Sequence, residues 1–201
     1  MRQKSIKGVS EALLKARGVI TNIEPLRLPD KPLDIEIGSG KGDFITCLAH
    51  DHPDRHYIAI ERNVYVCFRI LEKKEALQLH NLSIILGDAM HLKSYLDDHK
   101  VQVIYLNFSD PWPKKKHHKR RLTAPIFLPL YIDILKDDGR LQFRTDHLSF
   151  FEDSMLTLRA AFEISDIQYD LPASLYMTEY EIKKRKIGPI YQLTGRKKHV
   201  T

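Results

Sequence analysis

Cysteine is scarce in this sequence of 201 residues, because only Cys47 and Cys67 occur and they form no Cys-x-x-Cys pair. Two cysteines cannot build the disulfide framework of a small secreted protein, and their spacing indicates neither a zinc site nor a redox site. We expect both thiols to be reduced and buried as packing residues. Glycine and proline are also few, at 9 and 10 residues, which excludes collagen-like and low-complexity chains.

Long apolar runs are missing as well. In the first thirty residues the longest is Ala12-Leu13-Leu14, which predicts no secretion signal. No run approaches the roughly 20 residues that cross a bilayer, so we expect a protein of the cytoplasm with no membrane partner. The composition, with 43% hydrophobic and 29% charged residues, predicts a single folded domain with its own core.

Acidic residues are absent from one strongly basic stretch at residues 114–121. The chain has 32 Lys and Arg against 26 Asp and Glu, and a second basic concentration lies at residues 183–198. A solvated face would explain one such cluster, but two clusters favour a polyanionic partner. The adjacent His117 and His118 have no third ligand at a recognisable spacing, so we predict phosphate contact there and no metal.

Apolar patterns of period two alternate with helical patterns along the chain. We predict strands at residues 33–37, 57–61, 82–86, 101–108, 140–144, 163–168 and 189–194, and helices near residues 44–49, 64–80, 124–135 and 149–161. This order predicts an α/β fold, a Rossmann-like doubly wound and mostly parallel sheet of about seven strands with helices on both faces. Ligands on such sheets bind beyond the carboxyl ends of the strands.

A glycine-rich turn, Gly38-Ser39-Gly40-Lys41-Gly42, joins the first predicted strand to the first helix. Such a turn lets a ligand approach the backbone, although many turns of this kind bind nothing. The turn lacks the Gly-Lys-Ser/Thr sequence of a P-loop, and Asp43 stands where the dinucleotide fingerprint has its third glycine. We predict a nucleotide-like ligand that is not held by its phosphates.

Three acidic residues fit such a ligand. Glu61 ends the second strand, where a carboxylate accepts hydrogen bonds from both ribose hydroxyls of an adenosine. Asp88 ends the third strand and would accept from an adenine amino group, or it would simply bond its own backbone in a turn. Glu36 lies between two isoleucines, so it either meets an amine or cation or points to solvent. S-adenosylmethionine carries the ribose, adenine and ammonium groups that these acids suit.

The segment after the fourth strand resembles a known signature. Asn107-Phe108-Ser109-Asp110-Pro111-Trp112-Pro113-Lys114-Lys115, followed by Lys119-Arg120-Arg121-Leu122-Thr123, is similar to that of the bacterial tRNA (guanine-N7)-methyltransferases. Thr145-Asp146 and Thr178-Glu179-Tyr180-Glu181 extend the resemblance, which covers residues 33–194. It implies transfer of a methyl group from S-adenosylmethionine to N7 of a guanine in the variable loop of tRNA.

The resemblance also implies roles for individual residues. The predicted cofactor-binding residues are Glu36, Gly38, Gly40, Glu61, Asp88 and Asp110. The residues expected to contact the substrate are Lys114, Asp146, Thr178, Glu179, Tyr180 and Glu181. The RNA contacts expected from the basic loop are Lys115, Lys116, His117, Lys119, Arg120 and Arg121. The domain matching the family is residues 31–201, and residues 1–30 form an N-terminal extension whose ordering on RNA binding stays open.

Asp110 is the predicted catalytic residue. Guanine N7 carries a lone pair and no proton at neutral pH, so its methylation needs positioning rather than a base, and a carboxylate stabilises the cation that forms. Asp110 would serve in this way or would accept from the N1–H and amine of guanine. Thr178-x-x-Glu181 is also a capping-box pattern, which would start a helix.

Two other functions remain open at this stage. A non-catalytic RNA-binding protein would explain the basic clusters but not the acids, and an NAD-dependent dehydrogenase would explain Glu61 but not the glycine spacing. No obligate protein partner is indicated, and the chain is expected to be a monomer or a homodimer.

Overall fold

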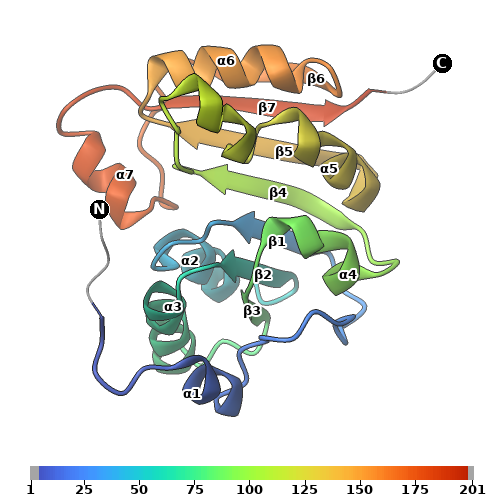
Figure 1. Cartoon of the computed structure of the whole chain (residues 1–201), viewed down its shortest axis with the longest axis vertical. Helices are drawn as coiled ribbons and strands as arrows, with labels where there is room; N and C mark the ends of the chain where they lie inside the picture. Colours follow the sequence, from blue (N-terminus) through green and yellow to red (C-terminus); the bar gives the residue numbers. More distant parts are fainter. Residues whose placement is uncertain (1–4, 199–201) are drawn as a thin grey trace.

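The strands form one seven-stranded sheet in the order β3-β2-β1-β4-β5-β7-β6 (Figure 1). The computed structural model describes residues 5–198. The strands are β1 (Leu33–Ile37), β2 (His56–Glu61), β3 (Leu82–Leu86), β4 (Val101–Asn107), β5 (Leu135–Thr145), β6 (Phe162–Gln168) and β7 (Tyr191–Lys197). Strands β1 to β5 pair in parallel, whereas β7 runs antiparallel to β5 and β6. The predicted Rossmann-like, mostly parallel sheet is therefore confirmed.

Helices cover both faces of this sheet, as predicted. They are α1 (Glu11–Ala16), α2 (Asp43–Asp51), α3 (Val64–Ala76), α4 (Leu92–Leu96), α5 (Leu128–Ile134), α6 (Leu148–Leu158) and α7 (Glu179–Lys184), with short 3₁₀ helices η1 (Ala89–His91), η2 (Lys115–Arg120) and η3 (Pro125–Phe127). Apolar residues of α1 to α3 build one core cluster, and those of α4 to α6 build the other. Helix α7 lies apart, beyond the ends toward which β4 and β5 point (Figure 1).

The central strands are apolar on both faces, which explains their nearly continuous hydrophobic sequence. In β2, Tyr57 and Ala59 pack in the cluster with α2 and α3, while Ile58 and Ile60 pack in the cluster with α4 to α6. Both sets are almost completely buried. Because β1 lies between β2 and β4, strand order reverses beside β1, and the residues that follow β1 and β4 are brought to one place.

The described part of the N-terminal extension packs on this body. Leu14 of α1 and Val19 are buried in the cluster with α2 and α3. The backbone of Ile20 bonds Ile84 and Leu86 at 2.9 Å each and so covers the free edge of β3. Residues 1–4 lie outside the described part, and any contact of the extension with RNA stays a prediction.

Two local predictions are corrected. The predicted helix at residues 64–80 ends at Ala76, and Gln78 turns the chain with a φ of 52°. Cys67 is buried as expected, but Cys47 is exposed. The helical period explains this, because the buried Phe44, Ile45 and Leu48 occupy one face of α2 and leave Cys47 on the other. Among the helices described, none is long and apolar enough to span a membrane.

Candidate active site

The glycine turn after β1 takes backbone conformations that only glycine adopts easily. Gly38, Gly40 and Gly42 have φ values of 75°, 54° and 80°. At Gly42 a Cβ would lie 2.9 Å from Cγ2 of Ile70, so this glycine allows α2 to pack on α3. At Gly40 a Cβ would meet nothing within 4 Å, so the turn faces open space there. A ligand can therefore reach the backbone at Gly40.

Glu61 lies beside this turn with a fixed carboxylate. Its Oε2 accepts from the backbone N–H of Gly40 at 3.1 Å, and its Oε1 accepts from those of Arg62 at 2.8 Å and Asn63 at 2.9 Å. Burial raises the pKa of the Glu61 carboxyl, while these backbone donors act in the opposite direction. The carboxylate is thus held at the end of β2, as the sequence predicted.

Glu36 is fully buried on β1 and is only partly satisfied. Its Oε1 accepts from the side-chain amide Nδ2 of Asn107 at 2.8 Å across the β1–β4 pair. Glu36 therefore does not point to solvent, and its contact with an amine or cation stays a prediction. Burial raises the pKa of the Glu36 carboxyl to about 8, against the lowering effect of the nearby Asn107 and Ser39 side chains. Among residues 5–198, three buried side-chain atoms have no hydrogen-bond partner: Glu36 Oε2 on β1, Asn107 Oδ1 at the end of β4 and Ser109 Oγ two residues further on. Buried polar atoms without a partner are rare in folded proteins, and a ligand that supplies donors would satisfy these three.

Asp88 makes the turn contact that was one of its two predicted roles, and its contact with an adenine amine stays a prediction. Its Oδ1 accepts from the backbone N–H of Met90 at 2.9 Å and caps η1, which is the turn contact. Its Oδ2 lies 3.4 Å from Nε of Arg62, and the side chain keeps a partly exposed position at the end of β3. Gly87 before it has no room for a side chain, because a Cβ would lie 2.3 Å from the hydroxyl of Tyr95. The turn therefore fixes Asp88 at the same edge as Glu61.

Asp110 lies in a strained loop after β4. Phe108 and Trp112 on either side of it have positive φ values of 52° and 42°, each of which costs about 1–3 kcal/mol. The Asp110 side chain is exposed at this carboxyl edge of the sheet. Such strain is kept where the surrounding structure holds a loop in a fixed shape, so Asp110 is presented rigidly.

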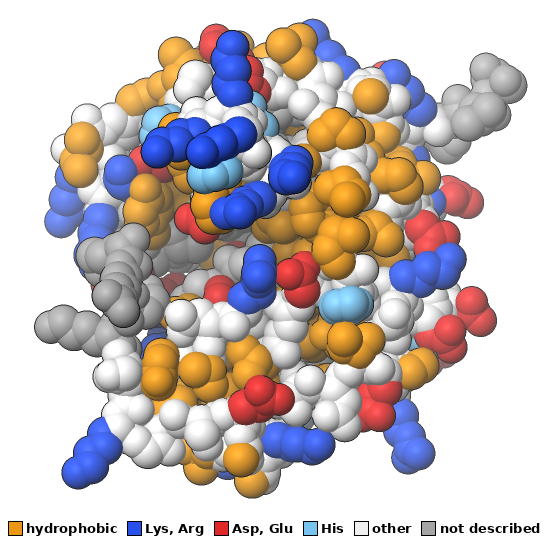
Figure 2. Space-filling view, viewed as in Figure 1, with side chains coloured by type: hydrophobic (Ala, Val, Ile, Leu, Met, Phe, Trp, Pro, Cys, Tyr) orange, Lys and Arg blue, Asp and Glu red, His pale blue; other side chains and the backbone are white. Residues whose placement is uncertain are grey.

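The basic loop at residues 114–121 forms η2, and most of its side chains are free to meet a polyanion. Lys114, Lys115, Lys116, Lys119 and Arg120 are exposed, and His117 is half-buried. The Arg120 guanidinium lies 5.0 Å from the Trp112 ring centroid, and the His117 ring meets Trp112 edge-on at 5.8 Å. Figure 2 shows Lys and Arg side chains gathered along one rim of a hollow in this face.

Arg121 differs from the rest of the loop. The sequence suggested an RNA contact, but the side chain is only 9% exposed. Its Nε donates to the carbonyl of Pro111 at 2.8 Å, and its NH1 pairs with Asp153 of α6 at 2.9 Å. The guanidinium also lies 4.9 Å from the Phe150 ring centroid. Arg121 anchors the loop to the body, and its predicted RNA contact stays a prediction.

Helix α7 begins at Thr178, whose hydroxyl accepts from the N–H of Glu181 at 2.9 Å. The predicted helix start is thus confirmed. Glu179 pairs with Lys41 of the glycine turn at 2.6 Å, which ties α7 to the turn. At the end of β5, Asp146 pairs with Lys184 at 2.8 Å and accepts from the Tyr180 hydroxyl at 3.3 Å.

Glu181 has a structural role in α7. Its side chain is fully buried and pairs with Arg144 of β5 at 3.3 Å and with Arg185 at 2.5 Å. These arginines satisfy its carboxylate, so Glu181 anchors α7 to the sheet, and its predicted contact with the substrate stays a prediction. The carboxylate does not complete a capping box for the same reason.

Several site residues were missed by the sequence reasoning. Asn107 and Ser109 stand inside the recognised motif, so their place at a strand end was the available signal. Lys41 was visible as the one charged residue of the glycine turn. Arg144 carried no signal, because an arginine in a strand normally indicates a solvent-facing position.

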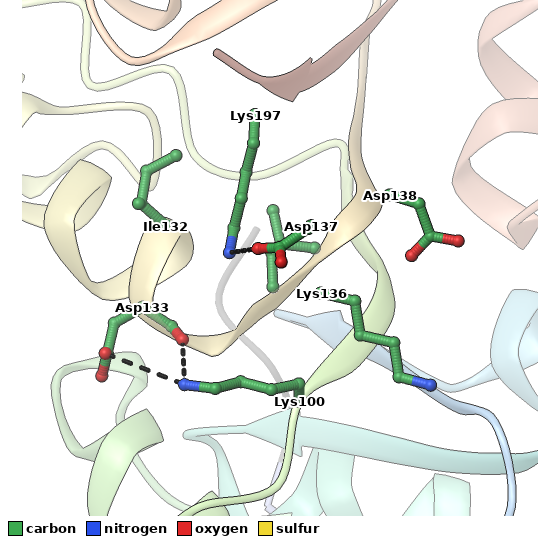
Figure 3. Close-up of a pocket in the computed structure, with 8 residues that line it drawn as sticks. Lys100, Ile132, Asp133, Lys136, Asp137, Asp138 and Lys197 are labelled. Carbon is green, nitrogen blue, oxygen red and sulfur yellow. Dashed lines mark hydrogen bonds and ion pairs between the residues drawn. The ribbon is translucent and has the colours of Figure 1, made fainter. Parts of the chain in front are cut away.

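A separate hollow of about 720 Å³ lies at the amino end of the sheet, between the starts of β4 and β5 and the end of β7 (Figure 3). There Lys100 pairs with Asp133, and Lys197 lies 3.4 Å from Asp137. The hollow is at the opposite end of the strands from Glu36, Glu61 and Asp110. Within residues 5–198, no group of three or more His, Cys, Asp or Glu side chains could hold a metal ion.

Comparisons with known proteins agree with this arrangement. Residues 30–193 match a family model described as "Putative methyltransferase". The tRNA (guanine-N(7)-)-methyltransferase of Lactobacillus gasseri is 42% identical over 172 residues, which are 81% of this chain and 79% of that protein. The enzyme of the same name from Latilactobacillus sakei subsp. sakei is 40% identical over 188 residues, 90% of this chain and 88% of that protein.

Among solved structures, a Streptococcus mutans protein in complex with SAH has the same fold. Its TM-score is 0.57 at 15% identity, and the match covers 85% of this chain and 91% of that one. The family model, the identity to the two named relatives and the fold agree with the motif that begins at Asn107. The chain belongs to the family of tRNA (guanine-N(7)-)-methyltransferases.

Proposed function

We propose that the protein transfers a methyl group from S-adenosylmethionine to N7 of a guanine in tRNA. The observation that carries this is the set of unpartnered buried acceptors, Glu36 Oε2 and Asn107 Oδ1, beside a glycine turn that faces open space. The names of the relatives supply the substrate and the position methylated. The resemblance of the motif supports a guanine in the variable loop, and a tRNA substrate supports action in the cytoplasm.

The residues present suit S-adenosylmethionine. Glu36 and Asn107 offer acceptors for its ammonium group, and Glu61 offers a fixed carboxylate for its ribose. Asp88 would accept from the adenine amine through the free face of its carboxylate. Gly38 and Gly40 leave the backbone open to the ligand. A phosphate-bearing cofactor such as NAD would bring negative charge to this group of acids, which disfavours the dehydrogenase alternative.

The bound methyl donor supplies an electrophilic carbon: the guanine N7 lone pair forms the new N–C bond, the C–S electron pair stays on sulfur, and the products are S-adenosylhomocysteine and a cationic N7-methylguanine. No proton leaves N7, so the protein needs no base at that atom. Asp110, exposed in its rigid loop, would stabilise the positive charge that develops on the base. This is electrostatic stabilisation by a preorganised carboxylate.

The tRNA would lie along the rim of the hollow. Lys115, Lys116, Lys119 and Arg120 present positive charge from η2 for its phosphates, with His117 beside them. Lys114, Asp146, Thr178, Glu179 and Tyr180 would contact the nucleotides near the target base. Phosphate contacts hold a nucleic acid in register, whereas contacts to the base select it.

The test is nucleoside analysis of bulk tRNA after incubation with the protein and methyl-labelled S-adenosylmethionine. We expect label in N7-methylguanosine. Label in another nucleoside would overturn the assignment of N7, and binding of tRNA with no label at all would favour the non-catalytic RNA-binding alternative. Equilibrium dialysis distinguishes a methyltransferase from the NAD-dependent dehydrogenase alternative, because we expect S-adenosylmethionine to bind and NAD not to bind.

A further inference from the structure

Two aromatic side chains meet at the substrate side of the site, one from β4 and one from α7. Phe108 follows the last residue of β4, and Tyr180 is the second residue of α7. Their ring centroids are 5.3 Å apart, and their planes are tilted by 57°. The Tyr180 side chain is 45% exposed, and Phe108 is half-buried. The pair therefore presents aromatic surface to the solvent at the site.

The backbone of Phe108 shows that this placement is imposed. A bulky residue at a φ of 52° is an outlier. The Phe108 N–H still donates to the carbonyl of Arg144 at 2.9 Å, so the sheet holds the residue in this conformation. The turn ends the alternation of side chains along β4 and places the Phe108 ring against Tyr180. Strain that the surroundings maintain is a feature of functional sites.

The Trp112 ring serves a different purpose. Arg120 lies over it and His117 meets it edge-on, so Trp112 organises the basic loop. The Phe108–Tyr180 pair lies near two carboxylates: Asp110 follows Phe108 closely in the chain, and Asp146 accepts from the Tyr180 hydroxyl. Lys184 pairs with Asp146, and its Nζ lies 5.2 Å from the Tyr180 ring centroid, whereas no cation among the described residues lies over the Phe108 ring. Aromatic surface beside carboxylates suits an aromatic base whose edge carries N–H donors.

We propose that Phe108 and Tyr180 form the surface on which the target guanine stacks, and that Phe108 is a substrate-binding residue. The inference rests on the proposed function and names how that site holds its base. A guanine that leaves the stack of a tRNA loop loses contact with its neighbours, and aromatic side chains replace that contact. The tilted rings of the ligand-free pair would open to admit the base.

This surface would also favour the reaction itself. The base is neutral before methyl transfer and cationic afterwards. A cation is attracted to the face of an aromatic ring, so stacking strengthens as the positive charge develops. An interaction that is stronger in the transition state than in the bound substrate raises kcat and not only affinity. Loss of the Phe108 ring should therefore lower both kcat and the affinity for tRNA.

The experiment compares two tRNAs that differ only at the methylated position, which is first located in the wild-type product. One carries guanine there and the other is abasic. Binding is measured with S-adenosylhomocysteine present, so that no methyl transfer occurs. Stacking of a base on an aromatic side chain is worth about 5- to 150-fold in affinity, and we expect the wild type to prefer the guanine tRNA by a factor in this range.

Phe108→Leu should remove most of this preference, because leucine has no aromatic face, and Phe108→Trp should keep it. Neither variant should change the Kd for S-adenosylhomocysteine by more than about twofold, since Phe108 lies outside the predicted cofactor contacts. Phe68→Leu is the matched control: Phe68 is a half-buried phenylalanine on α3 that lies under Arg17 at 5.4 Å. This control should keep the wild-type preference for the guanine tRNA.

If Phe108→Leu lowers the affinity for the guanine tRNA and for the abasic tRNA equally, the inference is overturned, because Phe108 would then only hold α7 in place. Failure of Phe108→Trp to keep the preference would overturn it as well. If the wild type forms no N7-methylguanosine, the proposed function itself fails and the inference falls with it. If the wild type forms this product but Phe108→Leu keeps the preference, the inference alone is wrong.

Discussion

Glu36 shows how a single buried residue can prepare a binding site. Its carboxyl has one donor, Asn107, and one oxygen without a partner, inside a sheet that excludes water. Ionisation there is costly, which is why its pKa is raised to about 8. A ligand that brings an ammonium group would offset that cost, so Glu36 suits the ammonium group of the proposed methyl donor.

The raised pKa gives a prediction for stability. Between the ordinary value of 4.5 and about 8, the folded protein holds a proton on Glu36 that the unfolded chain has released. The contribution of Glu36 to the free energy of unfolding is therefore fully present at low pH and is lost as the pH rises from about 4.5 toward 8. We expect Glu36→Gln to gain in Tm relative to the ligand-free wild type as the pH increases from 5 to 8.5. A difference in Tm that stays constant over this range would show that Glu36 is already ionised.

Asp110 gives a second prediction at this scale. Asp110→Asn keeps the shape of the side chain and removes its charge, so turnover should fall by about a hundredfold or more if the carboxylate stabilises the cationic base. The Kd for S-adenosylmethionine, measured by calorimetry, should change little. An equal loss of turnover and of cofactor affinity would assign Asp110 to the cofactor, and wild-type turnover would remove it from the mechanism.

At the scale of elements, α7 belongs to the site through charged pairs that cross the fold. Arg144 and Arg185 hold its buried Glu181, and Lys41 of the glycine turn holds its Glu179 at 2.6 Å. The neighbouring lysines Lys183 and Lys41 keep the pKa of the Glu179 carboxyl low, at about 2. The glycine turn, proposed to bind the cofactor, and α7, proposed to contact the substrate, are thus in direct contact.

This contact predicts that the two ligands influence each other. Lys41 and Glu179 are 43% and 42% exposed, so their pair is worth only about 0.2–1 kcal/mol. Lys41→Met should therefore reduce the effect of S-adenosylhomocysteine on tRNA affinity by about 1.5- to 5-fold. Lys183→Met is the control, because Lys183 pairs with the same Glu179 from within α7. An identical change in both variants would mean that the tie to the glycine turn carries no coupling.

For the whole molecule, the sequence predicted the sheet, the glycine turn and the ends of the strands that carry Glu61, Asp88 and Asp110. These features depend on local patterns that survive without knowledge of strand order. The Glu36–Asn107 pair was not predictable, because it requires β1 and β4 to be neighbours. The burial of Arg121 and Glu181 was not predictable either, since charged residues are normally exposed and only the tertiary structure shows the partners that compensate for burial.

The basic loop gives a prediction about the whole complex. Counterion release makes the logarithm of tRNA affinity fall linearly with the logarithm of salt concentration, by about 0.7–0.9 for each phosphate contacted. Four or five contacts would give a slope of magnitude about 3–4. Changing the exposed Lys115, Lys116 and Arg120 to Gln should lower the magnitude of the slope by about 2–3. The affinity for different tRNAs should fall to a similar degree, because phosphate contacts do not depend on the base sequence.

The matched control changes Lys100, Lys136 and Lys197 to Gln. These lysines line the hollow at the opposite end of the sheet, and their substitution removes the same amount of positive charge as the loop variant. This variant should keep the wild-type salt slope, because its lysines lie far from the rim that would hold the tRNA. S-adenosylmethionine affinity should hold in both variants, since that ligand carries no phosphate. If the two variants lose the same slope, net charge and not the loop attracts the tRNA. If the loop variant loses affinity for only some tRNAs, its residues read bases directly, and the separation between a phosphate-binding loop and a base-selecting Phe108–Tyr180 surface would be wrong.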